Sequence, residues 1–108
     1  MKKILVALMC AFTLTAFAQT CTLPRTANGN IKRSASEVYK FRKANPCPVT
    51  GKTTGACPGF QVEHTIPLCA CGPDKVSNMT WMATAEHKIK TKADVKHCAD
   101  LKKSGAVK

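Results

Sequence analysis

Three features of common functional classes are missing from this sequence. No C-x-x-C pair occurs, which counts against a structural zinc knuckle without excluding zinc. Gly51-Lys52-Thr53 resembles the end of a phosphate-binding loop, but Pro46 stands where its first glycine should be, so a P-loop is excluded. No internal repeat or low-complexity tract occurs, and 108 residues allow one domain at most.

The N-terminal apolar run, residues 4–17, is too short to cross a membrane. A basic start precedes it, and it ends on Ala16-Phe17-Ala18, with small residues at the two positions that a signal peptidase reads. Residues 1–18 are therefore expected to be a secretory signal, with no stable membrane insertion after cleavage. Residues 19–108 would form a single periplasmic or secreted domain.

Acidic residues are scarce in this exported part. The full chain has 17 Lys and Arg, and 15 remain without Lys2 and Lys3, against 6 Asp and Glu, which gives about +9. This excess favours an anionic partner such as nucleic acid, an envelope polymer or a membrane surface. Charge alone does not choose among them.

Cysteine is plentiful by contrast. Cys10 leaves with the signal, and an even number of cysteines in a short exported chain predicts disulfides. Cys47 and Cys57, ten positions apart around a Gly-rich turn, are the expected pair. The six remaining cysteines are Cys21, Cys47, Cys57, Cys69, Cys71 and Cys98.

The other four cysteines allow more than one pairing. Cys69 and Cys71 are too close in sequence to pair easily with each other. Each is therefore expected to reach Cys21 or Cys98, and the sequence leaves the assignment open.

Hydrophobic periodicity predicts a small α+β domain. A helix is expected over 31–44, where Ser34 and Glu37 have the form of a capping box. Alternation predicts a strand over 60–66, and a second short strand follows over 78–82.

A second helix is expected after these strands. Thr84 suits its N-cap, and the helix should run to about Lys102. Ile89 and Ala93 begin a thin apolar stripe on it, and residues 104–108 are expected to fray.

Four polar residues lie at the ends of the predicted strands and helix: Glu63, His64, Asn78 and His87. Singly, each has an ordinary structural explanation. Jointly, an acid, an amide and two imidazoles could hold a divalent cation and keep one imidazole as a base. Imidazoles titrate near neutrality, which suits deprotonation of water for phosphodiester hydrolysis.

Regular strand alternation would point Glu63 and His64 to opposite faces. Both can serve one centre only if the strand bends or ends there, as Pro67 favours.

With Ile66-Pro67-Leu68 and Gly72 between them, the four residues resemble the motif of the HNH nucleases, the ββα-metal or His-Me finger family. Residues 31–34 and 45–60 resemble a small bacterial subgroup with a cysteine knuckle ahead of the finger. The resemblance covers about residues 31–94. It implies a disulfide-containing ββα-metal finger, preceded by a helix, that cuts DNA, or sometimes RNA, with one divalent cation.

The resemblance also implies roles for individual residues. His64 would be the general base, and Asn78 would fix the loop and orient His64. Glu63 and His87 would bind the cation, with Mg²⁺ or Mn²⁺ favoured over Zn²⁺ or Ni²⁺. The lysines expected to contact phosphates, without reading bases, are Lys75, Lys88, Lys90 and Lys92.

Two positions depart from the family pattern. Glu63 stands where the family most often has Asp, which leaves weaker metal binding or loss of activity open. Cys71 stands where Gly is usual, which suggests an extra disulfide. In some intracellular relatives the knuckle cysteines hold zinc, so zinc at Cys47 and Cys57 remains an alternative.

Three functions follow in order of preference. The first is an exported, metal-dependent, largely non-specific nuclease, acting as a monomer on DNA more than on RNA. The second is a catalytically weak module that binds nucleic acid in the envelope on the same scaffold. The third is a cationic disulfide protein that acts on membranes or anionic glycans. The sequence identifies no inhibitor protein.

Overall fold

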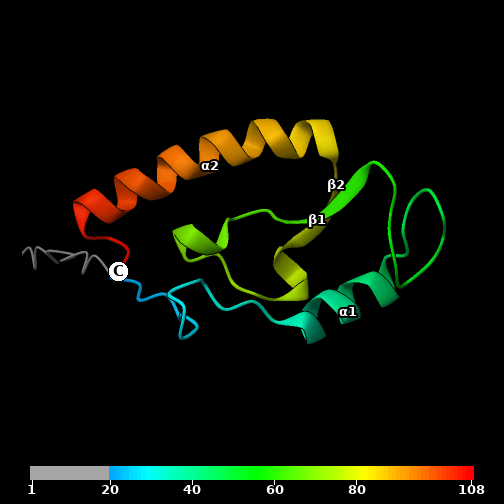
Figure 1. The fold of residues 1–108 in the computed structure, drawn as a ribbon, viewed down its shortest axis with the longest axis horizontal. Coiled ribbons are helices and arrows are strands. Elements are labelled where there is room, and N and C mark those ends of the chain that lie inside the picture. Colours follow the sequence, from blue (N-terminus) through cyan, green and yellow to red (C-terminus); the bar gives the residue numbers. More distant parts are fainter. Residues whose placement is uncertain (1–19) are drawn as a thin grey trace, which may run out of the picture.

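The computed structural model describes residues 20–108 and confirms a small α+β domain. Two helices lie on opposite sides of the molecule, and a two-stranded antiparallel hairpin joins them (Figure 1). The predicted signal peptide, residues 1–18, lies outside the described residues. The elements in order are α1 (Ala35–Ala44), β1 (Phe60–His64), the 3₁₀ turns η1 (Leu68–Ala70) and η2 (Val76–Asn78), β2 (Met79–Ala83) and α2 (Thr84–Ser104).

Helix α1 begins at Ala35, four residues later than the predicted start. The Ser34 hydroxyl caps it by accepting the Glu37 N–H at 3.3 Å, which is one half of the predicted capping box. The other half is missing, because the Ser34 N–H donates to Asp74 rather than to Glu37. The segment before Ser34 is extended instead, because Ile31 pairs with Arg25 in an isolated bridge. On its inner face α1 buries Phe41.

Trp81 of β2 packs against this helix. Its ring centroid lies 5.8 Å from that of Phe41, and its indole N–H donates to the Asn45 carbonyl at 2.7 Å. The Arg42 guanidinium covers the indole at 5.3 Å from the centroid. Trp81 thus links the hairpin to α1, and Arg42 is half-buried.

The hairpin pairs Phe60 with Ala83 at one end and His64 with Met79 at the other. Strand β1 therefore ends at His64, two residues earlier than predicted, and β2 is shifted by one residue from 78–82. The Thr84 N–H donates to the Gly59 carbonyl at 2.9 Å, so the N-cap is Ala83 and Thr84 is the first helical residue.

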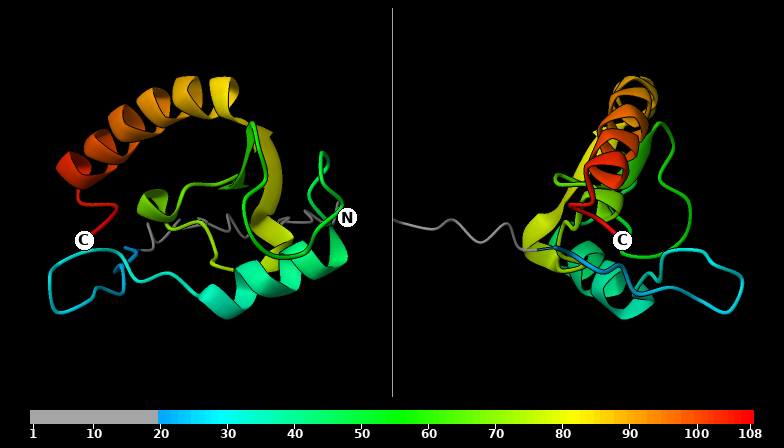
Figure 2. Two further views of the ribbon diagram at one scale, coloured as in Figure 1. Left: turned by 45° about the vertical axis from the view of Figure 1, so that its right-hand side comes forward. Right: turned by 90° about the vertical axis from the view of Figure 1, so that its left-hand side faces the viewer.

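Helix α2 has 21 residues and buries none of its side chains. The predicted apolar stripe is wrong, because Ile89 is 74% exposed and Ala93 is also exposed. The helix passes over η1 and the hairpin as an arch (Figure 2). It must therefore be held by cross-links and polar contacts rather than by a hydrophobic face.

The C-terminal residues are ordered against the N-terminal arm, so the predicted frayed tail is wrong. Val107 is buried and forms a parallel bridge with Cys21. The Leu23 N–H donates to the Lys108 carbonyl, and the Lys108 N–H donates to the Cys21 carbonyl, each at 2.9 Å. The two ends of the described chain thus form one small unit, as Figure 1 shows.

Three disulfides connect these parts. Cys47–Cys57 is the pair that the sequence predicted, and the structure resolves the others as Cys21–Cys71 and Cys69–Cys98. In this form the sulfur atoms of Cys47 and Cys57 are not thiolates, so the alternative of zinc at the knuckle has no support. Few hydrophobic side chains are buried, and a core this small gains much from cross-links.

We predict that loss of Cys69–Cys98 destabilises the protein by about 2–5 kcal/mol, because α2 has no buried face to replace it. The Cys69→Ser, Cys98→Ser double variant should show faster amide exchange throughout α2 and a lower urea midpoint. The matched control is Cys47→Ser, Cys57→Ser, which opens a loop of only 10 residues and should leave exchange in α2 unchanged. Equal protection of α2 in both variants would contradict the prediction.

Candidate active site

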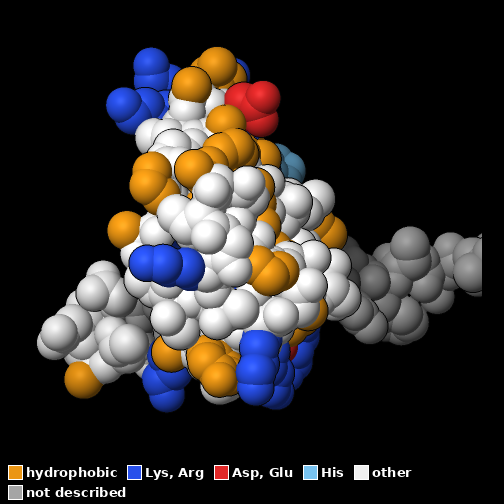
Figure 3. Space-filling model, turned by 90° about the vertical axis from the view of Figure 1, so that its right-hand side faces the viewer, with side chains coloured by type: hydrophobic (Ala, Val, Ile, Leu, Met, Phe, Trp, Pro, Cys, Tyr) orange, Lys and Arg blue, Asp and Glu red, His pale blue; other side chains and the backbone are white. Residues whose placement is uncertain are grey.

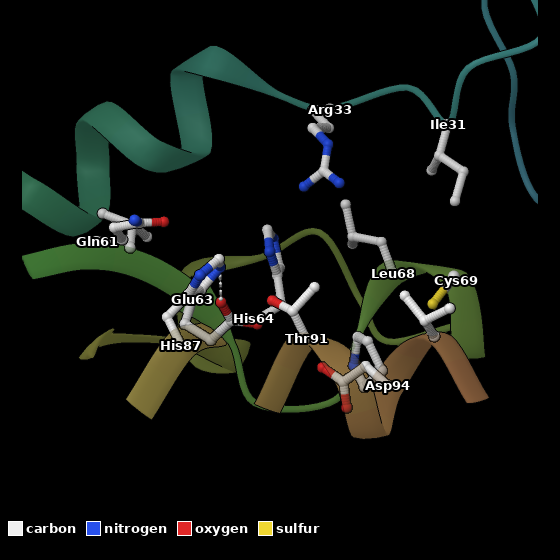
Figure 4. A pocket seen from close by; sticks show the side chains of 13 residues that line it. Ile31, Arg33, Gln61, Glu63, His64, Leu68, Cys69, His87, Thr91 and Asp94 are labelled. Carbon is white, nitrogen blue, oxygen red and sulfur yellow. Dashed lines mark ion pairs between the residues drawn. The ribbon is translucent and has the colours of Figure 1, made fainter. Parts of the chain in front are cut away.

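Three of the four predicted site residues line one pocket of about 420 Å³. Glu63 and His64 come from the end of β1, and His87 comes from the first turn of α2. The segment of residues 31–33 forms the opposite wall (Figure 4). Both β1 residues reach this pocket because the strand ends at His64 and regular alternation stops there.

Glu63 and His87 are in direct contact. Glu63 Oε2 lies 2.8 Å from His87 Nε2, and the Glu63 side chain is only 12% exposed. Two neighbouring ligand atoms on an octahedral cation, each about 2.1 Å from it, lie about 3 Å apart. The observed contact is that of a hydrogen bond, and the same two atoms could supply one oxygen and one nitrogen donor to a divalent cation. In the described part of the chain, no group of three or more His, Cys, Asp or Glu side chains is gathered for a metal.

Lys90 occupies the other oxygen of Glu63. Its ammonium donates to Glu63 Oε1 at 3.2 Å and also to Asp94, one turn further along α2. Burial would lower the pKa of Lys90, but its bonds to Asp94 and Glu63 raise it above the ordinary value. The phosphate contact of Lys90 stays a prediction, and in this structure its ammonium is paired with Glu63 and Asp94.

His64 is buried and held by Asp74. His64 Nε2 lies 3.0 Å from Asp74 Oδ1, and the imidazole residue is only 8% exposed. The second Asp74 oxygen accepts the Ser34 N–H at 2.6 Å, which ties this carboxylate to the start of α1. With Nε2 engaged, Nδ1 is the ring nitrogen that remains to accept a proton.

The carboxyl of Asp74 is stabilised in its charged form. Burial would raise its pKa, but hydrogen bonds from His64 and the Ser34 N–H, together with the charges of His64 and Arg33, lower it below the ordinary value. A charged Asp74 favours the His64 tautomer with the proton on Nε2.

Asn78 closes the loop between the strands rather than touching His64. Its amide donates to the Ile66 and Pro73 carbonyls at 2.8 and 3.0 Å and accepts the Ile66 N–H at 2.9 Å. Gly72 lies against this hydrogen-bonded loop. A Cβ on Gly72 would come within 1.9 Å of the Ile66 carbonyl oxygen. Asn78 therefore fixes Pro73, the residue before Asp74, and its own carbonyl accepts the N–H of Thr65, the residue after His64, at 2.9 Å.

Two residues of this site were missed by the sequence interpretation. Asp74 lies in the loop between the two strands, and its contact with His64 depends on how that loop folds. Arg33 directs its guanidinium into the pocket from the wall opposite α2 (Figure 4). It was read as part of a helix, and the extended conformation of residues 31–33 is what turns it inward.

The remaining predicted phosphate contacts lie outside this pocket. Lys75, Lys88 and Lys92 are exposed, and none of them lines it. They could contact a longer polyanion only beyond the pocket itself.

Comparison of the chain with protein-family models, curated proteins and solved structures gave no match.

We predict that Asp74 contributes to stability at neutral pH and that this contribution disappears in acid. Its folded pKa is lowered, so the stabilisation is present above the unfolded value of about 3.9 and is lost as pH falls through the folded value. Urea unfolding of the wild type and Asp74→Asn should differ at pH 7, and the gap should shrink as the solution is acidified below about pH 4. A gap that is constant with pH would show that the charge of Asp74 does not contribute.

Proposed function

We propose that this protein is an exported, metal-dependent nuclease of the HNH type with little sequence specificity. The observation that carries the proposal is the pocket itself. It brings a buried imidazole, held at Nε2 by a carboxylate, next to a Glu63–His87 pair that fits a cation. The order β1, β2, α2 agrees with the ββα-metal finger that the motif resembles.

In the proposed reaction, His64 Nδ1 accepts a proton from a water molecule while the water oxygen attacks the phosphorus of the phosphodiester. The bond from phosphorus to the leaving oxygen breaks, and solvent protonates that oxygen. Asp74 keeps the imidazole in the required tautomer and stabilises the imidazolium that forms. A divalent cation held by Glu63 and His87 would neutralise charge on the phosphate and the leaving oxygen.

Arg33 supports a phosphate substrate, because it faces this pocket from the wall opposite α2. A guanidinium matches phosphate oxygens in geometry and charge. The end of the molecule near the Cys47–Cys57 loop has apolar and uncharged side chains at its centre, with Lys and Arg toward its edges (Figure 3). That face offers no concentrated basic patch, so we place the polyanion along the pocket instead.

The three disulfides favour an oxidising compartment, in agreement with the proposed export. None of the helices in residues 20–108 is long and apolar enough to cross a membrane.

A second candidate, favoured by one observation, is a nucleic-acid-binding module without efficient catalysis. Both oxygens of Glu63 are already engaged, Oε2 by the His87 imidazole and Oε1 by the Lys90 ammonium. If they outcompete a metal, the scaffold would bind DNA in a salt-dependent manner without cutting it.

We predict plasmid nicking with Mg²⁺ or Mn²⁺ that stops on chelation. His64→Ala should lower the rate by about 10²–10⁴-fold, as expected for loss of a general base. The control is His97→Ala, an exposed histidine on α2. Nicking that is equal in His64→Ala and wild type, or absent across several metals while DNA is still bound, would favour the binding module. Running RNA in parallel identifies the preferred substrate.

We also predict that Arg33→Ala weakens DNA binding and shows that the pocket holds a phosphate. Loss of one phosphate contact should reduce the slope of log Kobs against log salt by roughly 1. Lys32→Ala is the matched control, since it removes the same charge from the neighbouring exposed residue, which does not line the pocket. Identical salt slopes for the two variants would remove Arg33 from the phosphate site.

A further inference from the structure

The Glu63 carboxylate lies between two side chains of α2, the His87 imidazole and the Lys90 ammonium. His87 Nε2 contacts Oε2 at 2.8 Å, and Lys90 Nζ contacts Oε1 at 3.2 Å. The side chains of Glu63 and Lys90 are 12% and 21% exposed, so this contact is largely shielded from solvent. A cation that binds Glu63 therefore meets an ammonium group that is already on the same carboxylate.

We propose that Lys90 is an internal cation that competes with the divalent metal for Glu63 and thereby sets the metal affinity of the free protein. The inference rests on the proposed metal site at Glu63 and His87. It assigns to Lys90 a contact with the candidate metal ligand Glu63, in addition to the phosphate contact that the sequence predicts.

The electrostatic reason is direct. A divalent cation and the Lys90 ammonium would lie within a few ångströms of each other on one carboxylate group, and like charges repel more strongly when solvent screening is reduced. Metal binding therefore requires the ammonium to move away from Glu63 Oε1. His87 carries no fixed charge, and a neutral imidazole with its proton on Nδ1 leaves Nε2 free as a ligand.

Asp94 gives Lys90 a second anchor. It lies four residues further along α2, bonds the same ammonium, and lines the same pocket as Glu63. Lys90 can leave Glu63 and remain paired, so its displacement does not leave an isolated charge at the pocket wall. This gives the ammonium two positions, one on both carboxylates and one on Asp94 alone.

A substrate phosphate would shift the Lys90 ammonium from the position on both carboxylates toward the position on Asp94 alone. Its negative charge favours the metal and also offers Lys90 another partner near the pocket. Metal and nucleic acid should then bind more tightly together than either does alone, whereas the free protein keeps a weak metal site.

Lys88 provides a matched control. It lies two residues before Lys90 on the same helix, is exposed, and has no ion pair among the described residues. Replacing either lysine with Met removes one positive charge from α2, so a general effect of net charge will appear in both variants. Only Lys90→Met removes the competitor from Glu63.

The test is calorimetric titration of Mn²⁺ into the disulfide-bonded protein without DNA. Lys90→Met should lower the Kd for Mn²⁺ at least about tenfold relative to Lys88→Met, which should stay within about twofold of wild type. Lys90→Gln, which keeps a polar end group, should act like Lys90→Met and covers the case that the Met variant folds poorly. Circular dichroism establishes the fold of each variant.

Equal Mn²⁺ affinity in the Lys88 and Lys90 variants overturns this inference and leaves the proposed metal site intact. If His87→Ala binds Mn²⁺ as wild type does, or if no variant binds Mn²⁺, the metal site itself fails and the inference fails with it. The two failures are therefore distinguishable in one set of titrations.

Discussion

The buried amide of Asn78 is the constraint on which the site depends. Its three hydrogen bonds close the loop that leaves β1 and returns to β2, and they join Ile66 to Pro73 across it. The loop is tight enough that Gly72 has no room for a side chain. Because β1 ends where this loop begins, His64 and Glu63 turn into one pocket, and Asp74 is brought to the buried imidazole.

Cross-links take the place of a core around this loop. Cys71 and Cys69 both lie in it, and they tie it to the N-terminal arm and to α2 through Cys21 and Cys98. The disulfides thus act on the same short segment that Asn78 closes, from two directions. Helix α2 contributes His87 to the site without burying any side chain, so its position depends on Cys69–Cys98 and on the Glu63 contacts.

Local patterns predicted the elements well, and long-range contacts set their limits. The Ser34 N-cap, strand β1 and the Cys47–Cys57 pair depend on residues close in sequence, and the structure contains all three. The start of α1 and the order of the C-terminal tail depend on pairing between distant segments, and both predictions were wrong. A pattern in 31–34 cannot show that Ile31 prefers a bridge to Arg25.

In the candidate site too, the sequence motif identified some residues, and others are identified only by their contacts in the folded chain. The motif brought Glu63, His64 and His87 forward as a group, and the structure places all three on one pocket. It did not show their partners, because Asp74 and Lys90 act through contacts that only the folded chain creates. Those partners have opposite effects: Asp74 supports the imidazole that would act as a base, whereas Lys90 occupies the carboxylate that would hold the metal. The choice between an active nuclease and a binding module therefore depends less on the extra methylene of Glu63 than on whether Lys90 can be moved from it.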